Sequence, residues 1–261
     1  MEGQERGAPA WPPGMNPAEF ANIFRWEREF WWYRGQRAIL FGVLEPFLAG
    51  RRVSRALEAG CGTGYFSHLL QQQGWPVVPL DISADGLKYA RAMGVGSAVQ
   101  GDVSRLPFGD GVFDVVLSLD VLPHLERGAE GPAAGELARV LARGGVIVVR
   151  VAALDALRSR HSEFAFEKQR FTRSRLVNLF TRCGIRVRRA TYANSLLLPA
   201  AWAKFRLWEP LLKRPAATGI APLPAWLDGL LFQALAAESR WLGAGRDFPL
   251  GQSLILIGEK A

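Results

Sequence analysis

Three glycines on alternate positions follow a short apolar run and one acid in the segment LEAGCGTGYF, residues 57–66. Glycine tolerates positive φ and lets a ligand reach the main chain where any Cβ would collide. A P-loop needs a Gly-Lys-Ser/Thr sequence that is absent here, and Tyr65 stands where a G-x-G-x-x-G dinucleotide loop needs its third glycine. Glu58, just before the loop, would repel a pyrophosphate. The segment therefore predicts a ligand that carries positive charge and no phosphates.

The segments before and after this loop alternate between strand-like and helix-like patterns of apolar residues. Apolar runs typical of strands are separated by helical patterns about ten residues long that end in glycine. Such alternation predicts a doubly wound, mostly parallel α/β sheet whose ligand lies beyond the carboxyl ends of the strands. Two further strand-like runs near the end of the chain, 185–193 and 248–260, raise the expected number of strands to seven. The strand-like runs are 53–60, 75–83, 96–108, 113–122, 146–153, 185–193 and 248–260, and the helical ones 65–74, 84–94, 134–145 and 172–184.

Four parts of the chain are expected to differ in role. Residues 1–17, rich in proline and glycine, predict a disordered leader, and 18–50, with apolar residues three and four apart, predict an N-terminal helical cap. The α/β domain comprises 51–194 and 246–261. Residues 195–245, rich in Leu, Trp and Pro, predict a helical insertion before the last strand. This insertion has three interpretations: a lid over an apolar acceptor, a homodimer surface, or an interfacial helix in peripheral contact with a membrane.

The acid and the G-x-G-x-G loop between a strand and a helix resemble the first motif of the class I S-adenosylmethionine-dependent methyltransferases. The resemblance covers residues 53–151 and implies the Rossmann-like methyltransferase fold, with S-adenosylmethionine as cofactor. It implies that Glu58 lies near the methionine amine and that Asp81 accepts the ribose hydroxyls. A carboxylate contributes about 1.5–3 kcal/mol per such charge-assisted bond. The remaining contacts that it implies are made by Gly60, Cys61, Gly62, Ile82, Asp102 at the adenine amine, Val103 and Leu119.

A narrower resemblance lies at both ends of the chain. EFWWYRGQRAIL, residues 29–40, resembles an N-terminal W-W-F/Y-x-x-R signature of one bacterial subgroup of these enzymes, and 151–199 resembles its downstream half. The resemblance implies that Tyr33 and Arg37 close over the cofactor, with Arg37 a partner for its carboxylate. The chain departs from the subgroup at Pro123, where a glutamate is usual, and between 167 and 171. These departures leave the cofactor site intact and the acceptor undefined.

Methyl transfer to a hydroxyl or an ammonium also needs a base, because those acceptors carry a proton at pH 7. His124 follows the fourth strand at the expected mouth of the pocket, and imidazole titrates in the useful range. His161 lies in a segment expected to fold over the site. Asp120 and Tyr192 are further candidates for the catalytic set, and no metal site is predicted. A structural hydrogen-bonding role is the alternative for His124.

Composition restricts the partners. The net charge of +8 comes mostly from arginine, and it fits either an anionic partner or a solvated basic face. No nucleic-acid-binding motif accompanies the charge, so nucleic acid is not expected as a partner. No apolar run reaches the ~18 residues of a membrane-spanning helix, and the start of the chain does not resemble a secretion signal. The two cysteines, Cys61 and Cys183, lie in different segments without metal-like spacing, so neither a disulfide nor zinc is expected. A reduced, cytoplasmic location is therefore expected.

These observations favour an enzyme that methylates an oxygen or nitrogen of a small-molecule biosynthetic intermediate, with an amphipathic or anionic acceptor. A second hypothesis is methylation of a glycan or lipid-linked intermediate at the membrane surface, which the subgroup resemblance implies. A third is a non-catalytic module that binds S-adenosylmethionine. Nicotinamide-dependent oxidoreduction is excluded by the glycine spacing.

Overall fold

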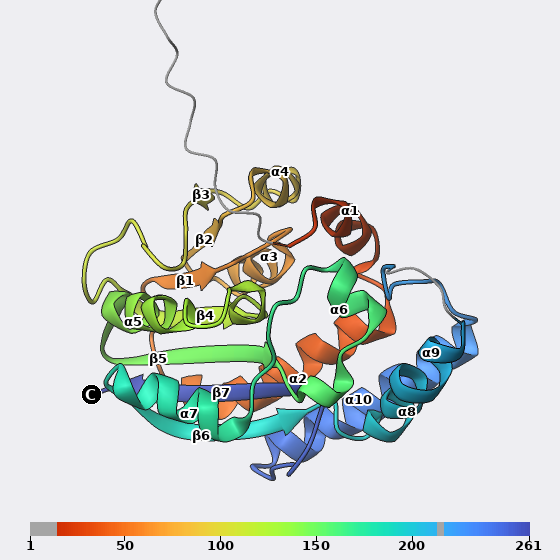
Figure 1. Ribbon diagram of the computed structural model, residues 1–261. Coiled ribbons are helices and arrows are strands. Elements are labelled where there is room, and N and C mark those ends of the chain that lie inside the picture. The colour runs from red at the N-terminus through yellow and green to blue at the C-terminus, as the bar shows by residue number, and fades with distance from the viewer. Residues whose placement is uncertain (1–14, 213–216) are drawn as a thin grey trace, which may run out of the picture.

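The computed structural model describes residues 15–212 and 217–261, which contain one seven-stranded sheet (Figure 1). Its strands are β1 (Ala56–Ala59), β2 (Val77–Asp81), β3 (Val99–Gln100), β4 (Phe113–Leu119), β5 (Leu141–Ala152), β6 (Ile185–Ala193) and β7 (Ser253–Lys260). The order is β3-β2-β1-β4-β5-β7-β6, and only β7 runs antiparallel to its neighbours. The predicted doubly wound sheet is confirmed. Its order reverses between β1 and β4, which makes the carboxyl end of β1 the switch point where such folds bind ligands.

Helices cover both faces of the sheet, because its central strands are buried on both sides. In β4 the Val116 side chain packs with the helices of one face, and Val115 and Leu117 pack with those of the other. Side chains alternate along a strand, so an apolar run of this kind needs two layers of helices. The first face carries α5 (Glu130–Val140) and α7 (Arg173–Arg182), and the second carries α2 (Trp31–Leu48), α3 (Tyr65–Gln72) and α10 (Ala225–Gly243).

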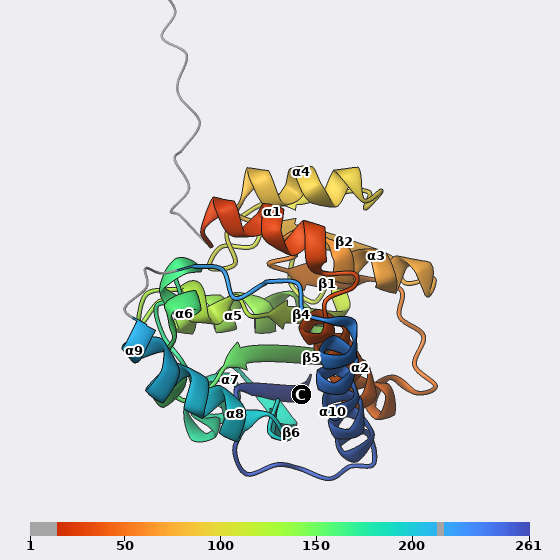
Figure 2. The ribbon, with the colours of Figure 1, turned by 90° about the vertical axis from the view of Figure 1, so that its right-hand side faces the viewer.

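The N-terminal helical pattern forms two helices rather than one. α1 (Pro17–Trp26) ends at a turn over residues 27–30, and α2 then begins at Trp31. Figure 2 shows α1 beside α4 (Ala84–Ala92), over the edge of the sheet that holds β2. The predicted leader lies outside the described residues up to residue 14, and α1 begins at its last residue, Pro17.

α2 and α10 pack against each other closely because small residues line their contact. A Cβ on Gly35 would lie 2.2 Å from Leu235 Cδ1, so only glycine fits there. Ser239 Oγ donates to the carbonyl oxygen of Ala38 at 2.6 Å. Asp228 of α10 accepts from the N–H of Trp31, the first residue of α2, at 3.0 Å. A side chain far along the chain thus caps α2, whose own N-cap residue, Phe30, provides no side-chain acceptor.

One predicted boundary is wrong. The helical pattern at 134–145 was expected to stop at its Gly-Gly pair, but α5 ends at Val140 and β5 begins at Leu141. Leu141 pairs with Phe113 of β4, and the next regular pairs begin only at Val146. The four residues between them are an irregularity in the ladder, so strand pairing overrides the local helical pattern.

Short helices follow the two central strands β4 and β5. After β4 comes the 3₁₀ helix η1 (Leu122–His124), and after β5 come η2 (Asp155–Leu157) and α6 (Arg160–Phe164). The insertion begins with α8 (Leu198–Ala203), a π-helical turn (Lys204–Trp208) and α9 (Glu209–Leu212), and ends with α10. None of the helices in the described ranges is both long enough and apolar enough to cross a bilayer.

Candidate functional site

The glycine loop between β1 and α3 has the backbone that its sequence predicts. Gly60, Gly62 and Gly64 all adopt positive φ, at +87°, +54° and +77°. The N–H groups of Gly60 and Cys61 both donate to the carbonyl oxygen of Leu80, which ties the loop to the end of β2. A Cβ on Gly60 would lie 2.1 Å from Val121 Cγ2. A side chain at Gly60 would therefore displace Val121, and the positive φ of all three positions favours glycine.

Two buried acids flank this loop. Glu58, at 2 % exposure, accepts from Ser67 Oγ, and burial raises its pKa to about 8. Asp81 ends β2 and accepts from the N–H of Gly62 and of Ser83, each at 2.8 Å. Burial also raises the pKa of Asp81, against these hydrogen bonds. Both groups are therefore poised to gain from a cationic or hydrogen-bond-donating ligand.

The third predicted acid, Asp102, follows β3. Its Oδ1 accepts from the N–H of Ser104 at 2.8 Å and from Ser104 Oγ at 2.5 Å, which fixes the carboxylate at the end of the sheet. The structure brings all the predicted cofactor residues to one cavity of about 1160 Å³. Its lining includes Tyr33, Arg37, Glu58, Gly60, Cys61, Gly62, Asp81, Ile82, Asp102, Val103 and Leu119.

The turn between α1 and α2 also reaches the glycine loop, which the sequence did not predict. Thr63 Oγ1 donates to Glu27 Oε2 at 2.6 Å, and both residues are buried. Burial raises the pKa of Glu27 to about 7, against the Thr63 hydrogen bond and the charges of Arg37 and Arg28. Glu27 lies in a segment that reads as an ordinary amphipathic helix, so no local signal marked it.

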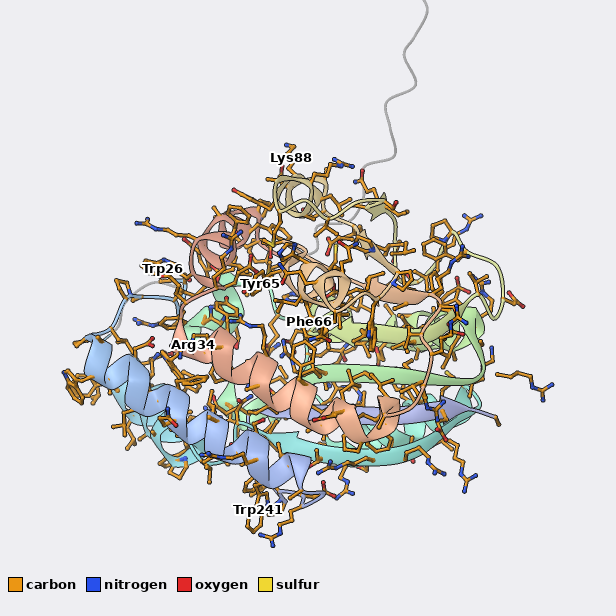
Figure 3. All side chains as sticks on the ribbon, turned by 180° about the vertical axis from the view of Figure 1, so that it is seen from behind. Trp26, Arg34, Tyr65, Phe66, Lys88 and Trp241 are labelled. Atoms are coloured by element: carbon orange, nitrogen blue, oxygen red, sulfur yellow. The ribbon has the colours of Figure 1, made fainter. Side chains whose placement is uncertain are left out.

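Arg37 lines the cavity, but its guanidinium is partly occupied. It donates to the carbonyl oxygens of Glu27 and Arg28 and stacks over the Tyr65 ring, 4.8 Å from its centroid. Tyr65 and Phe66, which begin α3, point toward α2 (Figure 3). Counted from Tyr33, Arg37 also stands one position beyond the arginine of the W-W-F/Y-x-x-R signature, where this chain has Gln36. Its role toward the cofactor carboxylate stays a prediction.

His124 ends η1 at the cavity wall and is the best placed of the predicted catalytic residues. Its Nδ1 is buried without a hydrogen-bond partner in the described structure. Burial lowers its pKa, against the charges of Asp120 and Glu167, so the imidazole is neutral at pH 7. Asp120 adopts φ of +59° and pairs with Arg150 of β5, with an Nη2 to Oδ2 distance of 2.6 Å. The Asp120 carboxylate is therefore engaged by Arg150, whereas His124 Nδ1 has no partner among the described residues.

His161 joins three segments. Its Nδ1 accepts from the N–H of Gly219 at 3.1 Å and lies 3.8 Å from Glu19 Oε1 of α1. Thr218 Oγ1 donates to the same Glu19 oxygen at 3.1 Å. Burial lowers the pKa of His161. His161 therefore lines the cavity but uses one ring nitrogen to hold the insertion against α1.

Tyr192 is placed differently from what was expected. It lies on β6 in the core beneath α5 and α7, and its hydroxyl accepts from the N–H of Arg173 at 3.3 Å. It does not belong to the residues that line the cavity. The alternation of side chains along β6 directs it into that core, so the prediction of a catalytic role for Tyr192 is wrong in its placement.

The far end of the cavity is apolar and is closed by the insertion. Arg160 is the polar side chain of note there, because its Nε and Nη1 are buried and have no hydrogen-bond partner among the described residues. The closest acid, Glu209 of α9, lies 3.9 Å from Arg160 Nε. The apolar lining of this acceptor chamber, as we call it, is Leu197, Ala200, Ala201, Phe205, Ile220, Leu223, Leu227 and Leu231.

Residues 57–149 match the model of a family described as a methyltransferase domain. Malonyl-(acyl-carrier protein) O-methyltransferase of Pectobacterium atrosepticum is 35% identical over 145 residues, which are 53% of this chain and 51% of the relative. The chain spans about half the length of the curated relatives it matches. The match covers the glycine loop and the acids that follow it.

Solved structures share the whole fold. A SAM-dependent methyltransferase from Archaeoglobus fulgidus superposes with a TM-score of 0.57 at 19% identity, over 91% of this chain and 99% of that one. A SAM-dependent methyltransferase from Corynebacterium glutamicum gives 0.54 at 17% identity, over 94% and 100%. At these identities the likeness shows the fold alone. The matched domain, the curated relatives and the fold together support a class I S-adenosylmethionine-dependent methyltransferase domain in this chain, and they imply S-adenosylmethionine as its cofactor.

Proposed function

We propose that this protein transfers a methyl group to an oxygen or nitrogen of a small-molecule biosynthetic intermediate. The observation that carries the proposal is the single cavity that joins the glycine loop to the acceptor chamber. Its volume of about 1160 Å³ exceeds the ~300–1,000 Å³ of ordinary ligand pockets, which leaves room for a cofactor and an acceptor together. When bound, S-adenosylmethionine supplies a methyl group activated on a sulfonium centre.

The residues present fit that cofactor. The bare loop at Gly60–Gly62 allows close approach to the main chain, and Asp81 and Asp102 each keep acceptor capacity at the ends of β2 and β3. Glu58 and Glu27 place two buried carboxyl groups beside the same loop, which suits a ligand with positive charge. The chain's own contribution is then alignment of the acceptor and exclusion of water.

The acceptor chamber favours an acceptor with an apolar body and an anionic group. Its lining is mostly aliphatic, and Arg160 presents buried donors that none of the residues in the described ranges accepts from. Lys204 adds a second positive charge at the wall. The malonyl group in the Pectobacterium relative's name bears a carboxylate, which agrees with this chemistry. Oxygen, as a hydroxyl or carboxylate, is thus the first acceptor atom to test.

A hydroxyl or ammonium acceptor would have to lose a proton. His124 suits this task because burial lowers its pKa and keeps a neutral imidazole at the wall. A carboxylate acceptor needs no base, so the effect of removing His124 distinguishes the two kinds of acceptor.

The decisive experiment is calorimetry with S-adenosylhomocysteine on the wild type and Asp81→Ala, followed by a methyl-transfer screen of hydroxy and carboxylic acids by mass spectrometry. Micromolar binding that Asp81→Ala weakens, followed by a methylated product, would support the proposal. Binding without any product would favour the non-catalytic module. Absence of binding by the wild type would contradict the proposed function itself.

A lipid-linked acceptor is the second candidate, and one observation favours it. The insertion exposes a set of large apolar side chains, with the exposed bases Lys204 and Arg206 among them. Tryptophan, leucine and basic residues on one helical segment are typical of helices that lie in a membrane interface. We call this set the insertion patch: Leu196, Trp202, Leu207, Trp208, Leu211, Trp226 and Leu230.

Flotation with vesicles of phosphatidylcholine, with and without phosphatidylglycerol, tests that candidate. If the insertion patch binds lipid, the wild type floats with the anionic vesicles and Trp202→Ser/Trp208→Ser does not. Trp241→Ser is the matched control. Trp241 is also exposed, but it lies near the C-terminal end of α10 (Figure 3), whereas Trp226 of the insertion patch lies near the N-terminal end. A wild type that stays at the bottom of the gradient would count against the lipid-linked acceptor.

A further inference from the structure

The turn between α1 and α2 forms a second wall of the cofactor site. Phe20 of α1 packs over the glycine loop, 3.8 Å from where a Cβ on Gly62 would lie. At the end of α1, Glu27 accepts from Thr63 Oγ1 within the loop. On α2, Arg37 stacks on Tyr65, the residue that follows the loop. Three contacts from the N-terminal helices therefore converge on one short segment of backbone.

One atom in this wall is unexplained by the fold. Thr63 occupies Glu27 Oε2, but Oε1 is buried and has no hydrogen-bond partner in the described structure. The residue as a whole is 5 % exposed and lines the cavity. Arg37 lies close by, yet its guanidinium donates to the carbonyl oxygens of Glu27 and Arg28 and not to the carboxylate. A buried carboxylate oxygen without a donor is costly, so a ligand that supplies one would be favoured.

We propose that Glu27 Oε1 accepts a hydrogen bond from the α-ammonium of the cofactor's methionine moiety. This inference rests on the binding of S-adenosylmethionine in the cavity. The ammonium is the group of that cofactor with hydrogen-bond donors and full positive charge, and it matches an acceptor held beside the bare loop. The α1–α2 turn then closes over the amino-acid end of the cofactor, while Asp81 and Asp102 hold its nucleoside end.

The charged groups around Glu27 set the dependence on pH. Burial favours the neutral form of Glu27, whereas the Thr63 hydrogen bond and the charges of Arg37 and Arg28 favour its ionised form. Burial is also the main cause of the raised pKa of Glu58, and the charge of Glu27 adds to it. The pKa of Glu27 is about 7 and that of Glu58 about 8. Below these values the carboxyls are protonated and cannot pair with an ammonium. Affinity for the cationic end should therefore rise as pH increases from 6 to 8.

The test compares two ligands that differ in one part. S-adenosylhomocysteine carries the amino-acid group, whereas 5′-methylthioadenosine keeps the nucleoside and the thioether but lacks the ammonium and carboxylate. Calorimetry on Glu27→Gln should show S-adenosylhomocysteine weakened by about tenfold or more, with 5′-methylthioadenosine changed less than about twofold. Glu29→Gln is the matched control, since Glu29 is an exposed acid in the same turn, and it should change neither affinity.

Each outcome decides something. Equal weakening of both ligands by Glu27→Gln would show that Glu27 only holds the loop, and unchanged affinity for both would overturn the contact; either result contradicts the inference. In the wild type, the affinity for S-adenosylhomocysteine should rise between pH 6 and pH 8, with a smaller rise in Glu27→Gln and none for 5′-methylthioadenosine. Failure of the wild type to bind either ligand would contradict the proposed function instead.

Discussion

The two ends of the cavity are built in different ways. The floor of the cofactor end is made of main chain and strand ends, held by contacts within one βα unit such as Gly60 N–H to Leu80 and Gly62 N–H to Asp81, and the α1–α2 turn covers it. The acceptor end is made of side chains from helices that are brought together across long stretches of sequence, as Arg160 and Glu209 are. Backbone geometry restricts which substitutions the cofactor end tolerates, whereas a single side-chain substitution can change the shape of the acceptor end.

The largest effect is expected at the cofactor end. Gly60→Ala places a Cβ 2.1 Å from Val121 Cγ2. Residue 60 also has a φ of +87°, which alanine rarely adopts, so the loop must move. We expect the affinity for S-adenosylhomocysteine to fall roughly a hundredfold or more, as calorimetry would show. Gly74→Ala has a similar φ of +83° but open space around its Cβ, and it should leave the affinity unchanged. If Gly60→Ala bound normally, the backbone would not restrict the cofactor end as argued.

His124→Ala should come next in size. Loss of a neutral imidazole from the wall is expected to lower turnover by about tenfold or more for a hydroxyl or amine acceptor. The affinity for S-adenosylhomocysteine should change little, because within the described residues the His124 side chain makes no hydrogen bond to the glycine loop or to Asp81. Steady-state kinetics with the acceptor found by the screen would measure this. Unchanged turnover would remove His124 as the base.

Arg160→Ala tests the acceptor end alone. If its unpartnered donors hold an anionic group, KM for a carboxylate acceptor should rise by roughly tenfold, with cofactor affinity unaffected. Arg158→Ala, two residues earlier, removes an exposed arginine that bonds only the carbonyl oxygen of Glu167. A rise in KM of the same size in both variants would show that the effect is general electrostatics rather than a contact.

The smallest effect concerns stability. Asp228→Ala removes the acceptor that caps α2 from α10, and we expect a loss of about 1 kcal/mol in the free energy of unfolding, measured by urea denaturation. Asp110→Ala breaks an ion pair of a largely exposed acid and should cost less than about 0.5 kcal/mol. Equal losses would mean that the cap does not couple the two helices.

The sequence predicted the parts of the molecule whose signals are local. The seven strands follow from runs of apolar residues, and the loop around Gly60 and Gly62 follows from its spacing. Val116 and Leu117 read as a strand buried on both faces, and the structure places them so. These features depend on residues within one βα unit, so a pattern along the chain contains them.

What the sequence did not predict depends on contacts across the chain. Glu27 meets Thr63 across 36 positions, and no periodicity encodes that contact. Tyr192 was expected at the site because its segment resembles the subgroup, but its register on β6 turns it into the core. The start of β5 at Leu141 was missed because pairing with Phe113 overrides local helix propensity. Arg160 was likewise not predicted, since only the fold shows that two of its donors have no hydrogen-bond partner within 15–212 and 217–261.

The contacts of His161 have a consequence for the order of events. Gly219 of the insertion, Glu19 of α1 and His161 of α6 meet at one point, and Thr218 reinforces it. One of these segments covers the cofactor and another covers the acceptor chamber. Moving either cover breaks contacts of the other, so the two ligands should exchange through a shared opening event.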